Sequence, residues 1–232
     1  MKFYIKAIGD VPFSEDAVSA WYGYLQKGGD VRLYEDIEEV PVDRSNMVIG
    51  DIEDTEFFFN ELGIYPDIDI RYPRELRQNE DLWKRNLMSA KPTIHNLFYE
   101  NSFVKPLENL KEFEPFIGYQ PEKIGQIKGD IILSDIVNFV SEYRCFILYG
   151  EPIGIKHYLG DQTIFPNCKI IKKVTELYKK APCAYSLDIG VLDTGETAIV
   201  EFNDAWACGS YGLEPRLYTR FLSERWIEIL RK

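Results

Sequence analysis

The chain has few of the side chains that form disulfides or thiolate metal sites. Its 232 residues include four cysteines and two histidines. The cysteines are far apart and form no CxxC pair, so a structural zinc site is poorly supported, and nothing else in the sequence points to a cysteine–histidine nucleophile. They are expected to be reduced thiols, mostly packed inside the protein. The residues concerned are Cys145, Cys168, Cys183, Cys208, His95 and His157.

Positive charge is also scarce. The chain has 27 lysines and arginines against 38 aspartates and glutamates, a formal net charge of −11. No basic field is therefore available to neutralise the phosphates along a nucleic-acid strand, and nucleic acid is not an expected partner. A compact basic pocket for a single nucleotide remains compatible with this composition.

Long apolar runs are absent as well. No stretch approaches the length needed to cross a bilayer, and Met1–Lys6 lacks the apolar run of a signal peptide. We therefore expect a soluble, cytoplasmic protein with no membrane partner. With 45% hydrophobic and 14% aromatic residues, the chain can bury a sizeable core as one unit or as two or three small lobes. There is no internal repeat or low-complexity linker.

Strands and helices alternate over about the first 70 residues, which indicates a small α/β lobe. Ser14 is a plausible N-cap, and Gly28 and Gly29 would stop the helix that follows it. The expected strands are 3–8, 31–34 and 47–49, and the expected helices run to about Lys27 and over 52–62.

The rest of the chain predicts an α+β body. Tyr72-Pro73 opens a mostly polar stretch that we expect to be helical over 74–88, with Pro92 as its interruption. From Phe103 onward the sequence becomes rich in strands. These are expected at 103–106, 131–133, 144–149, 153–158, 184–192 and 197–203, with helices over 170–180 and 217–230.

The segment 184–203 reads as a β-hairpin with a short turn around Thr194-Gly195. If Asp193 faces Glu196 across a two-residue loop, Asp188 lies directly opposite Glu201, and Ser186 lies close to Asn203. Opposed side chains in an antiparallel pair share one face, and so do residues two apart on one strand. The hairpin would therefore bring two acids and an amide together.

Two carboxylates placed opposite each other destabilise a sheet unless a shared cation or a raised pKa relieves their repulsion. Hard oxygen ligands of this kind suit Mg²⁺, which usually completes its shell with water and substrate phosphates. The alternative is a solvent-facing side of the hairpin with tolerated charges. The hairpin alone favours neither, because its register depends on an assumed turn.

In the context of the C-terminal half, this cluster resembles the ATP-grasp superfamily, whose last strands carry an acid and then Glu-x-Asn, here Asp188 and Glu201-Phe202-Asn203. Upstream, Phe103–Pro106 resembles the strand with a phosphate-binding lysine. Ser134–Arg144 resembles the inter-lobe hinge followed by an acid and a basic residue. The closer likeness is to a compact clade of mostly undetermined substrate, which ends in segments like Glu201–Trp206, Gly209–Gly212 and Arg225-Trp226.

The resemblance implies an α+β ATP-grasp fold, in which two subdomains grip ATP, preceded by the small α/β lobe. The implied boundaries are 1–72 for the N-terminal lobe, 73–133 for the first subdomain and 134–232 for the second, which carries the metal site. The first lobe matches only in size and α/β character.

The resemblance also implies roles for single residues. Lys105 would contact phosphates, the hinge would read adenine, Glu142 would bind ribose, and Arg144 and Lys156 would act on the transferring phosphoryl group. Arg85, or alternatively Lys84, would assist from the other lobe. The implied hinge residues are Asp135, Ile136 and Val137, and the implied Mg²⁺ ligands are Asp188, Glu201 and Asn203. Lys111 could belong to the mobile flap over the triphosphate or to a solvated loop. The usual glycine-rich run is missing there, since the stretch contains only Gly118.

The activity implied is an ATP-dependent carboxylate–amine ligase that uses Mg²⁺ and ATP and forms an acyl-phosphate. Its substrates would be small-molecule, peptide or protein carboxylates and amines, which the sequence does not identify. The alternatives are a phosphotransferase with the same ATP site and a non-catalytic nucleotide-binding module. A homodimer is compatible with the superfamily, although the oligomeric state stays open.

Overall fold

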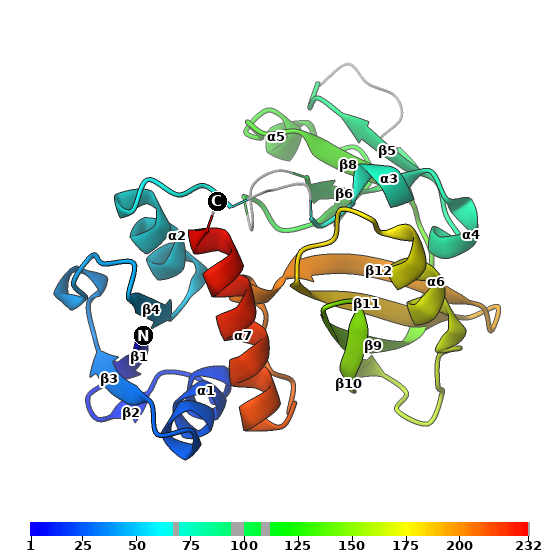
Figure 1. Ribbon diagram of the computed structural model, residues 1–232. Coiled ribbons are helices and arrows are strands. Elements are labelled where there is room, and N and C mark those ends of the chain that lie inside the picture. The colour runs from blue at the N-terminus through cyan, green and yellow to red at the C-terminus, as the bar shows by residue number, and fades with distance from the viewer. Residues whose placement is uncertain (67–69, 94–99, 108–111, 232) are drawn as a thin grey trace.

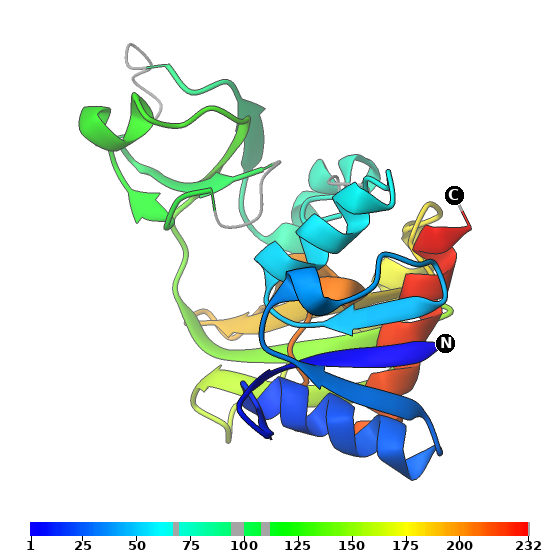
Figure 2. The same cartoon turned by 90° about the vertical axis from the view of Figure 1, so that its left-hand side faces the viewer.

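The computed structural model describes residues 1–66, 70–93, 100–107 and 112–231, so His95 and Lys111 lie outside the described residues. Three sheets are formed by these parts of the chain. Figure 1 shows the N-terminal sheet on one side of helix α7 (Pro215–Leu230). On the other side lies the sheet with the longest strands, here called the largest sheet. The third sheet is formed by strands that lie between Leu87 and Asp135. Figure 2, a view turned by 90°, shows this sheet apart from the N-terminal sheet.

The N-terminal sheet confirms the predicted α/β lobe. Strand β1 (Lys2–Ile8) pairs in parallel with β3 (Asp30–Tyr34) and with β4 (Asn46–Ile49), and the short β2 (Val11–Pro12) folds back on the end of β1. Ser14 caps α1 as predicted, since its Oγ accepts from the amide of Ala17 at 3.1 Å. The helices are α1 (Glu15–Gln26), η1 (Ile37–Glu39) and α2 (Ile52–Glu61).

The largest sheet is antiparallel, with the strand order β10-β9-β11-β12. One face packs Leu187, Ile189 and Phe202 into an apolar core against α6. The opposite face carries the charged residues of interest. Strand β9 begins five residues earlier than predicted. The elements are β9 (Phe139–Leu148), β10 (Glu151–Gly160), α6 (Lys169–Leu177), β11 (Ala184–Leu192), β12 (Thr197–Asp204) and η3 (Ala205–Ala207).

The prediction of one helix over 74–88 is wrong. Two short helices occupy its first part, and α4 ends where Lys84 adopts a left-handed backbone with φ of 52°. Residues from Leu87 onward join the third sheet by pairing with β8, so tertiary strand pairing overrides local helix propensity. This sheet has the order β5-β8-β6-β7. The elements are α3 (Arg74–Arg77), α4 (Glu80–Trp83), β5 (Leu87–Ala90), β6 (Ser102–Pro106), β7 (Phe116–Ile117), α5 (Pro121–Ile124) and β8 (Ile131–Asp135).

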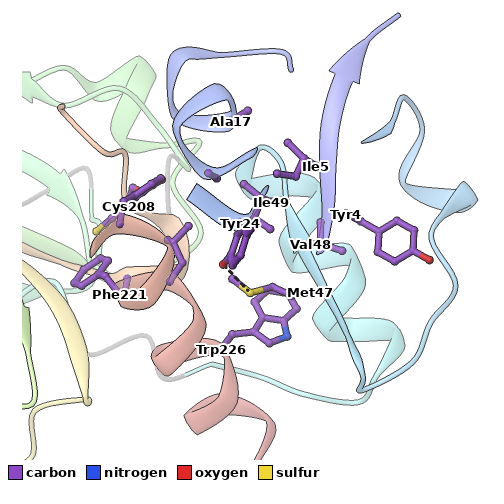
Figure 3. Close-up of a cluster of buried hydrophobic side chains, with 14 of the residues drawn as sticks. Tyr4, Ile5, Ala17, Tyr24, Met47, Val48, Ile49, Cys208, Phe221 and Trp226 are labelled. Atoms are coloured by element: carbon purple, nitrogen blue, oxygen red, sulfur yellow. Dashed lines mark hydrogen bonds between the residues drawn. The ribbon is translucent and has the colours of Figure 1, made fainter. Parts of the chain in front are cut away.

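Helix α7 (Pro215–Leu230) joins the N-terminal sheet to the largest one through a shared apolar core. Trp226 is fully buried, and its indole N–H donates to the carbonyl of Asn46 at 3.2 Å. On another side of the helix, Phe221 meets Phe146 of β9 edge to face. Figure 3 shows Trp226, Met47 and Tyr24 packed together, with Tyr24 hydrogen-bonded to Met47. The two sheets are therefore fixed relative to each other by α7.

The expectation that the cysteines are mostly packed holds in part. Cys145 and Cys208 are buried and Cys183 is half-buried, whereas Cys168 is exposed. Within the described ranges, no helix has the length and apolar character needed to cross a membrane.

Candidate functional site

The β11–β12 hairpin places Asp188 opposite Glu201 and Ser186 opposite Asn203, which confirms the predicted pairing. The assumed two-residue turn, however, is wrong. Leu192 pairs with Glu196 through an amide–carbonyl hydrogen bond of 2.8 Å, so the loop has three residues and ends at Gly195, whose φ is +85°. The register shifts by one residue between Asp188 and Ile189, which leaves Val200 as an extra residue in β12. The extra residue in the bulge compensates for the extra residue in the turn, so Asp188 still lies opposite Glu201.

Four charged residues form a row across the largest sheet. Lys156 of β10 lies opposite Arg144 of β9, Arg144 lies opposite Asp188 of β11, and Asp188 lies opposite Glu201 of β12. Directly opposed residues of an antiparallel pair point to the same face, so all four side chains share one face of the sheet. Two bases are thereby followed by two acids across four strands.

Arg144 and Asp188 form a bidentate ion pair inside this row. The Arg144 Nε and Nη2 atoms donate to the two Asp188 carboxylate oxygens at 2.9 and 2.7 Å. The Asp188 residue is only 1% exposed. Burial raises the pKa of Asp188 to about 6, and the hydrogen bonds from Arg144 act in the opposite direction. Arg144 thus holds a buried carboxylate in a fixed orientation.

Glu201 is held by bases from outside its own sheet. Lys105 of β6 places its Nζ 3.1 Å from Glu201 Oε2, and the Arg71 Nη2 atom lies 3.9 Å from the same oxygen. Burial disfavours the ionised form of Glu201, but the charges of Lys105 and Arg71 outweigh it and lower the pKa of this carboxyl. The sequence interpretation missed Arg71, whose position ahead of Tyr72-Pro73 carries no motif.

A cavity of about 350 Å³ lies where β8 passes into β9, at the predicted hinge. It is bounded by the two sheets that this connection joins. Asp135 has its carboxylate bound by the backbone amide and the side chain of Asn86, at 2.9 and 2.7 Å. Glu142, which also lines the cavity, accepts a hydrogen bond of 2.5 Å from the Tyr158 hydroxyl. The lining includes Tyr72, Arg85, Phe103, Lys105, Asp135, Ile136, Val137, Phe139, Glu142 and Val200.

Arg85 lines this cavity, but its guanidinium is bound to the bulged strand. It donates to the carbonyls of Ile199 and Val200 at 2.7 and 2.9 Å. These carbonyls flank the extra residue of β12, where the regular ladder is interrupted. Arg85 therefore supports the backbone just before Glu201. The alternative residue, Lys84, forms an ion pair of 3.2 Å with Glu196 and is not among the cavity residues.

Two tyrosines flank Arg144, and neither was predicted as a site residue. The Arg144 guanidinium carbon lies 4.6 Å from the ring centre of Tyr211 and 5.9 Å from that of Tyr158. Tyr211 has a left-handed backbone with φ of 44° and a 47% exposed side chain. The available sequence signal was an aromatic residue in a short segment bounded by Gly209 and Gly212.

Two acids of the row, together with the neighbouring Asn203, supply a set of oxygen donors that fits Mg²⁺. Asp188 and Glu201 contribute carboxylates, and Asn203 contributes an amide whose nitrogen lies 3.4 Å from Asp188 Oδ2. Hard oxygens are what Mg²⁺ prefers. No group of three or more His, Cys, Asp or Glu side chains among the described residues forms a metal site by itself. A Mg²⁺ ion here would therefore depend on the amide and on ligand phosphates as well.

A sheet with a charged row, a facing sheet that contributes a lysine, and a hinge cavity between them define an ATP-grasp domain. The chain belongs to the family described as ATP-grasp domain, R2K clade family 2, whose model matches residues 81–221. No curated protein matches the chain.

Solved structures of ATP-grasp ligases share the fold over almost the whole chain. The D-alanine–D-alanine ligase from Bacillus anthracis, complexed with ATP, is 13% identical with a TM-score of 0.61, covering 99% of this chain and 96% of that one. D-cycloserine synthetase DcsG is 13% identical with a TM-score of 0.61, covering 99% of this chain and 100% of that one. The ATP-grasp ligase PsnB, complexed with a minimal precursor, is 9% identical with a TM-score of 0.55, covering 96% of this chain and 98% of that one. At these identities the likeness establishes the fold alone.

Proposed function

We propose that the protein is an ATP-dependent carboxylate–amine ligase that works through an acyl-phosphate. The observation that carries this proposal is the row Lys156–Arg144–Asp188–Glu201, with Lys105 reaching Glu201 from the facing sheet. Two bases and two acids lie side by side there, close to a cavity large enough for part of a nucleotide. As part of the same proposal, residues 1–72, 73–133 and 134–232 act as the N-terminal lobe and the two ATP-grasp subdomains.

The hinge cavity would hold the nucleoside. Backbone groups of Asp135, Ile136 and Val137 would meet the adenine edge, while Phe103 and Val200 supply apolar walls. Glu142, which lines the cavity and precedes Arg144 by two residues on β9, would accept hydrogen bonds from the ribose hydroxyls. The phosphates would then extend along the charged row. Lys105 lies between the cavity and Glu201, which suits contact with the α- and β-phosphates.

The acids and the bases of the row would have different roles. Asp188, Glu201 and Asn203 would hold Mg²⁺, which would supply charge neutralisation for the phosphates. Arg144 and Lys156 lie side by side at the other end of the row, where they would stabilise negative charge on the transferring phosphoryl group. Arg144 is already fixed by Asp188, so little reorganisation is needed at the moment of reaction.

The reaction has two steps. A carboxylate oxygen of the first substrate attacks the γ-phosphorus, and the bond from that phosphorus to the β,γ-bridging oxygen breaks to release ADP. The nitrogen of a neutral amine then attacks the acyl carbon, the carbon–oxygen bond to phosphate breaks, and the amine loses a proton as inorganic phosphate leaves. Positioning and electrostatic stabilisation account for the catalysis, so no nucleophile of the protein is required.

Calorimetric titration of ATP with and without Mg²⁺ tests the nucleotide site. We expect Mg²⁺-dependent binding by the wild type, and its loss in the double variant Glu201→Gln/Asn203→Ala. The matched control is Glu196→Gln, which removes a carboxylate from the same hairpin near its exposed turn and should leave binding unchanged. A folded wild type that does not bind ATP in the presence of Mg²⁺ would refute the ligase proposal.

The ligase is separated from a phosphotransferase by the fate of the phosphate. With Mg²⁺–ATP, candidate carboxylates and amines, the ligase releases ADP and inorganic phosphate in equal amounts and only when both substrates are present. Hydroxylamine should replace the amine by trapping the acyl-phosphate as a hydroxamate. Stable transfer of the γ-phosphate to a single substrate would instead establish phosphorylation.

A further inference from the structure

The N-terminal sheet has a crevice at the carboxyl ends of its parallel strands. Strand β1 lies in the middle, with β3 along one edge and β4 along the other. The chain thus runs from β1 to one side, through β3, and then crosses to β4 on the opposite side. Ligands of open parallel sheets bind outside the carboxyl ends of the strands, at the point where the strand order reverses. In this sheet that point lies between the ends of β1 and β4.

A cavity of about 320 Å³ lies at this position. The end of β4 and the starts of α1 and α2 form one side of it, and the segment after the Glu-x-Asn strand forms the other. Its walls are mostly apolar or aromatic, as expected for a site that encloses a small organic molecule. Its lining includes Phe13, Asp16, Ile49, Asp51, Trp206 and Cys208.

The charged lining of the cavity is acidic. Asp16 and Asp51 belong to it, and none of the lining residues that the structure describes is a lysine, arginine or histidine. Asp51 already has a cation, because the Lys6 ammonium lies 2.5 Å from its carboxylate. Asp16 Oδ1 accepts from the amide and hydroxyl of Ser210 at 2.6 and 2.8 Å, and no ion-pair partner of Asp16 occurs within the described parts of the chain. A cationic group of a ligand would supply that partner.

The same segment links the cavity to the phosphate site. Tyr211 covers the Arg144 guanidinium, and its neighbour Ser210 binds Asp16. Cys208, which lines the cavity, lies within hydrogen-bonding reach of the carbonyl of Asn203, with 3.7 Å between Sγ and the oxygen. At Gly209 a Cβ atom would come within 2.6 Å of Asp16 Oδ2, so glycine permits this close approach of the two lobes. A molecule in the cavity would therefore contact the same segment that reaches Arg144.

We propose that this cavity binds the amine substrate, a primary amine about the size of one amino acid, in its ammonium form with Asp16 as counter-ion. The ammonium would lose one proton to solvent before its nitrogen, then neutral, attacks the acyl carbon. The assignment rests on the proposed ligase function for its role, although the binding itself can be measured without turnover. The volume lies at the lower end of the range of about 300–1,000 Å³ for small-molecule sites, which excludes a long peptide from the cavity itself. The apolar walls would receive the side chain of the amine.

The test is ligand-observed NMR with the full chain and Mg²⁺–AMPPNP, using the twenty free amino acids as probes. We expect saturation transfer to one or a few of them, and none to the matching 2-hydroxy acids, in which a hydroxyl of nearly the same size replaces the ammonium group. Asp16→Asn should weaken that binding by about tenfold or more, since a charge-assisted contact is lost. Glu15→Gln is the matched control, because Glu15 is the neighbouring acid in the first turn of α1, is exposed and does not line the cavity.

Several outcomes would overturn the assignment. These are equal binding of the 2-hydroxy acids, equal affinity of Asp16→Asn and Glu15→Gln, and the absence of any amino-acid signal in a protein that binds Mg²⁺–ATP. If Asp16→Asn does not fold, Asp16→Ser also removes the charge while keeping an oxygen acceptor at this position, and the same loss of binding is expected. Failure to bind ATP would count against the proposed function, whereas ATP binding without amine binding would count against this inference alone.

Discussion

The Nζ atom of Lys105 lies 3.1 Å from Oε2 of Glu201, although 96 residues separate the two and they belong to different sheets. Both side chains are about five-sixths buried, with 16% and 17% exposed. Each group thus serves as counter-ion for the other. Because Lys105 is proposed to bind phosphates and Glu201 to bind Mg²⁺, Mg²⁺–ATP would replace one ion pair by two new ones.

Replacement of Lys105 by methionine should therefore affect the two states differently. It keeps the buried aliphatic stem but removes the phosphate contact, and it leaves Glu201 beside Arg71 alone. We expect Mg²⁺–ATP affinity to fall by about tenfold to a hundredfold, as for loss of a charged hydrogen bond of about 1.5–3 kcal/mol. Calorimetry measures this change, with Lys91→Met as the control because Lys91 is an exposed lysine just beyond β5. Unchanged affinity would remove Lys105 from the phosphate site.

Arg85→Met should lower stability through the bulge of β12. The substitution leaves the carbonyls of Ile199 and Val200 without their side-chain donor, and an unsatisfied buried polar group costs about 1–3 kcal/mol. Urea unfolding measures the loss. Lys84→Met is the control, since its partner Glu196 is exposed and such surface pairs contribute at most about 1 kcal/mol. Equal effects of the two variants would show that the contacts to the bulge do not stabilise it.

Arg225→Met should be the more destabilising change in helix α7. Arg225 is 1% exposed and binds both oxygens of Asp204, at 2.7 and 2.6 Å, as well as Glu228 at 2.6 Å. Removing one partner of a buried ion pair costs about 3–5 kcal/mol, because the remaining carboxylate is left unpaired. We expect a loss of this size in chemical unfolding, against less than about 0.5 kcal/mol for the exposed Arg220→Met on the same helix. A loss below 1 kcal/mol for Arg225→Met would contradict the argument.

The ion pair of Lys6 with Asp51 should make stability depend on acid pH. Burial opposes ionisation of Asp51, but hydrogen bonds from Lys6 and from the Asp54 amide outweigh it and lower the pKa of Asp51 below its ordinary 3.8. A carboxyl with a lowered folded-state pKa stabilises the fold above the unfolded pKa, and this contribution is lost as the pH falls through the folded one.

The difference in free energy of unfolding between the wild type and Asp51→Asn should accordingly be constant from pH 7 to pH 5 and shrink below about pH 4. Urea unfolding across this range measures it. A difference that persists unchanged at pH 2.5, or that grows on acidification, would show that Asp51 is not stabilised in its ionised form.

The predicted pairing of Asp188 with Glu201 is confirmed, although the turn on which it was based is wrong. Counting back from a two-residue loop gives the observed pairing only because Val200 adds a residue to β12 and cancels the error. Alternation along a strand is visible in sequence, whereas a bulge depends on what stabilises its carbonyls. Here that is Arg85, more than 110 residues away in the chain.

Local patterns determined much of the fold. The capped helix after Ser14, the alternating strands and helices of the first 62 residues, and the hairpin of β11 and β12 follow from hydrophobic periodicity and from turn residues. The order of Lys105, the hinge, Glu142, Arg144, Asp188 and Glu201-x-Asn203 was enough to indicate the ATP-grasp family, which the match over 81–221 confirms. The roles of these single residues stay predictions.

Tertiary structure alone decided which of these groups meet. The pairing of Lys105 and Arg71 with Glu201, the pairing of Asp16 with Ser210, and the conversion of the end of the predicted helix 74–88 into β5 all depend on the approach of distant segments. Such contacts are set by how sheets and helices pack around shared cores, here through α7. Sequence periodicity reports which face of an element is buried, but it carries no information on which other element covers that face.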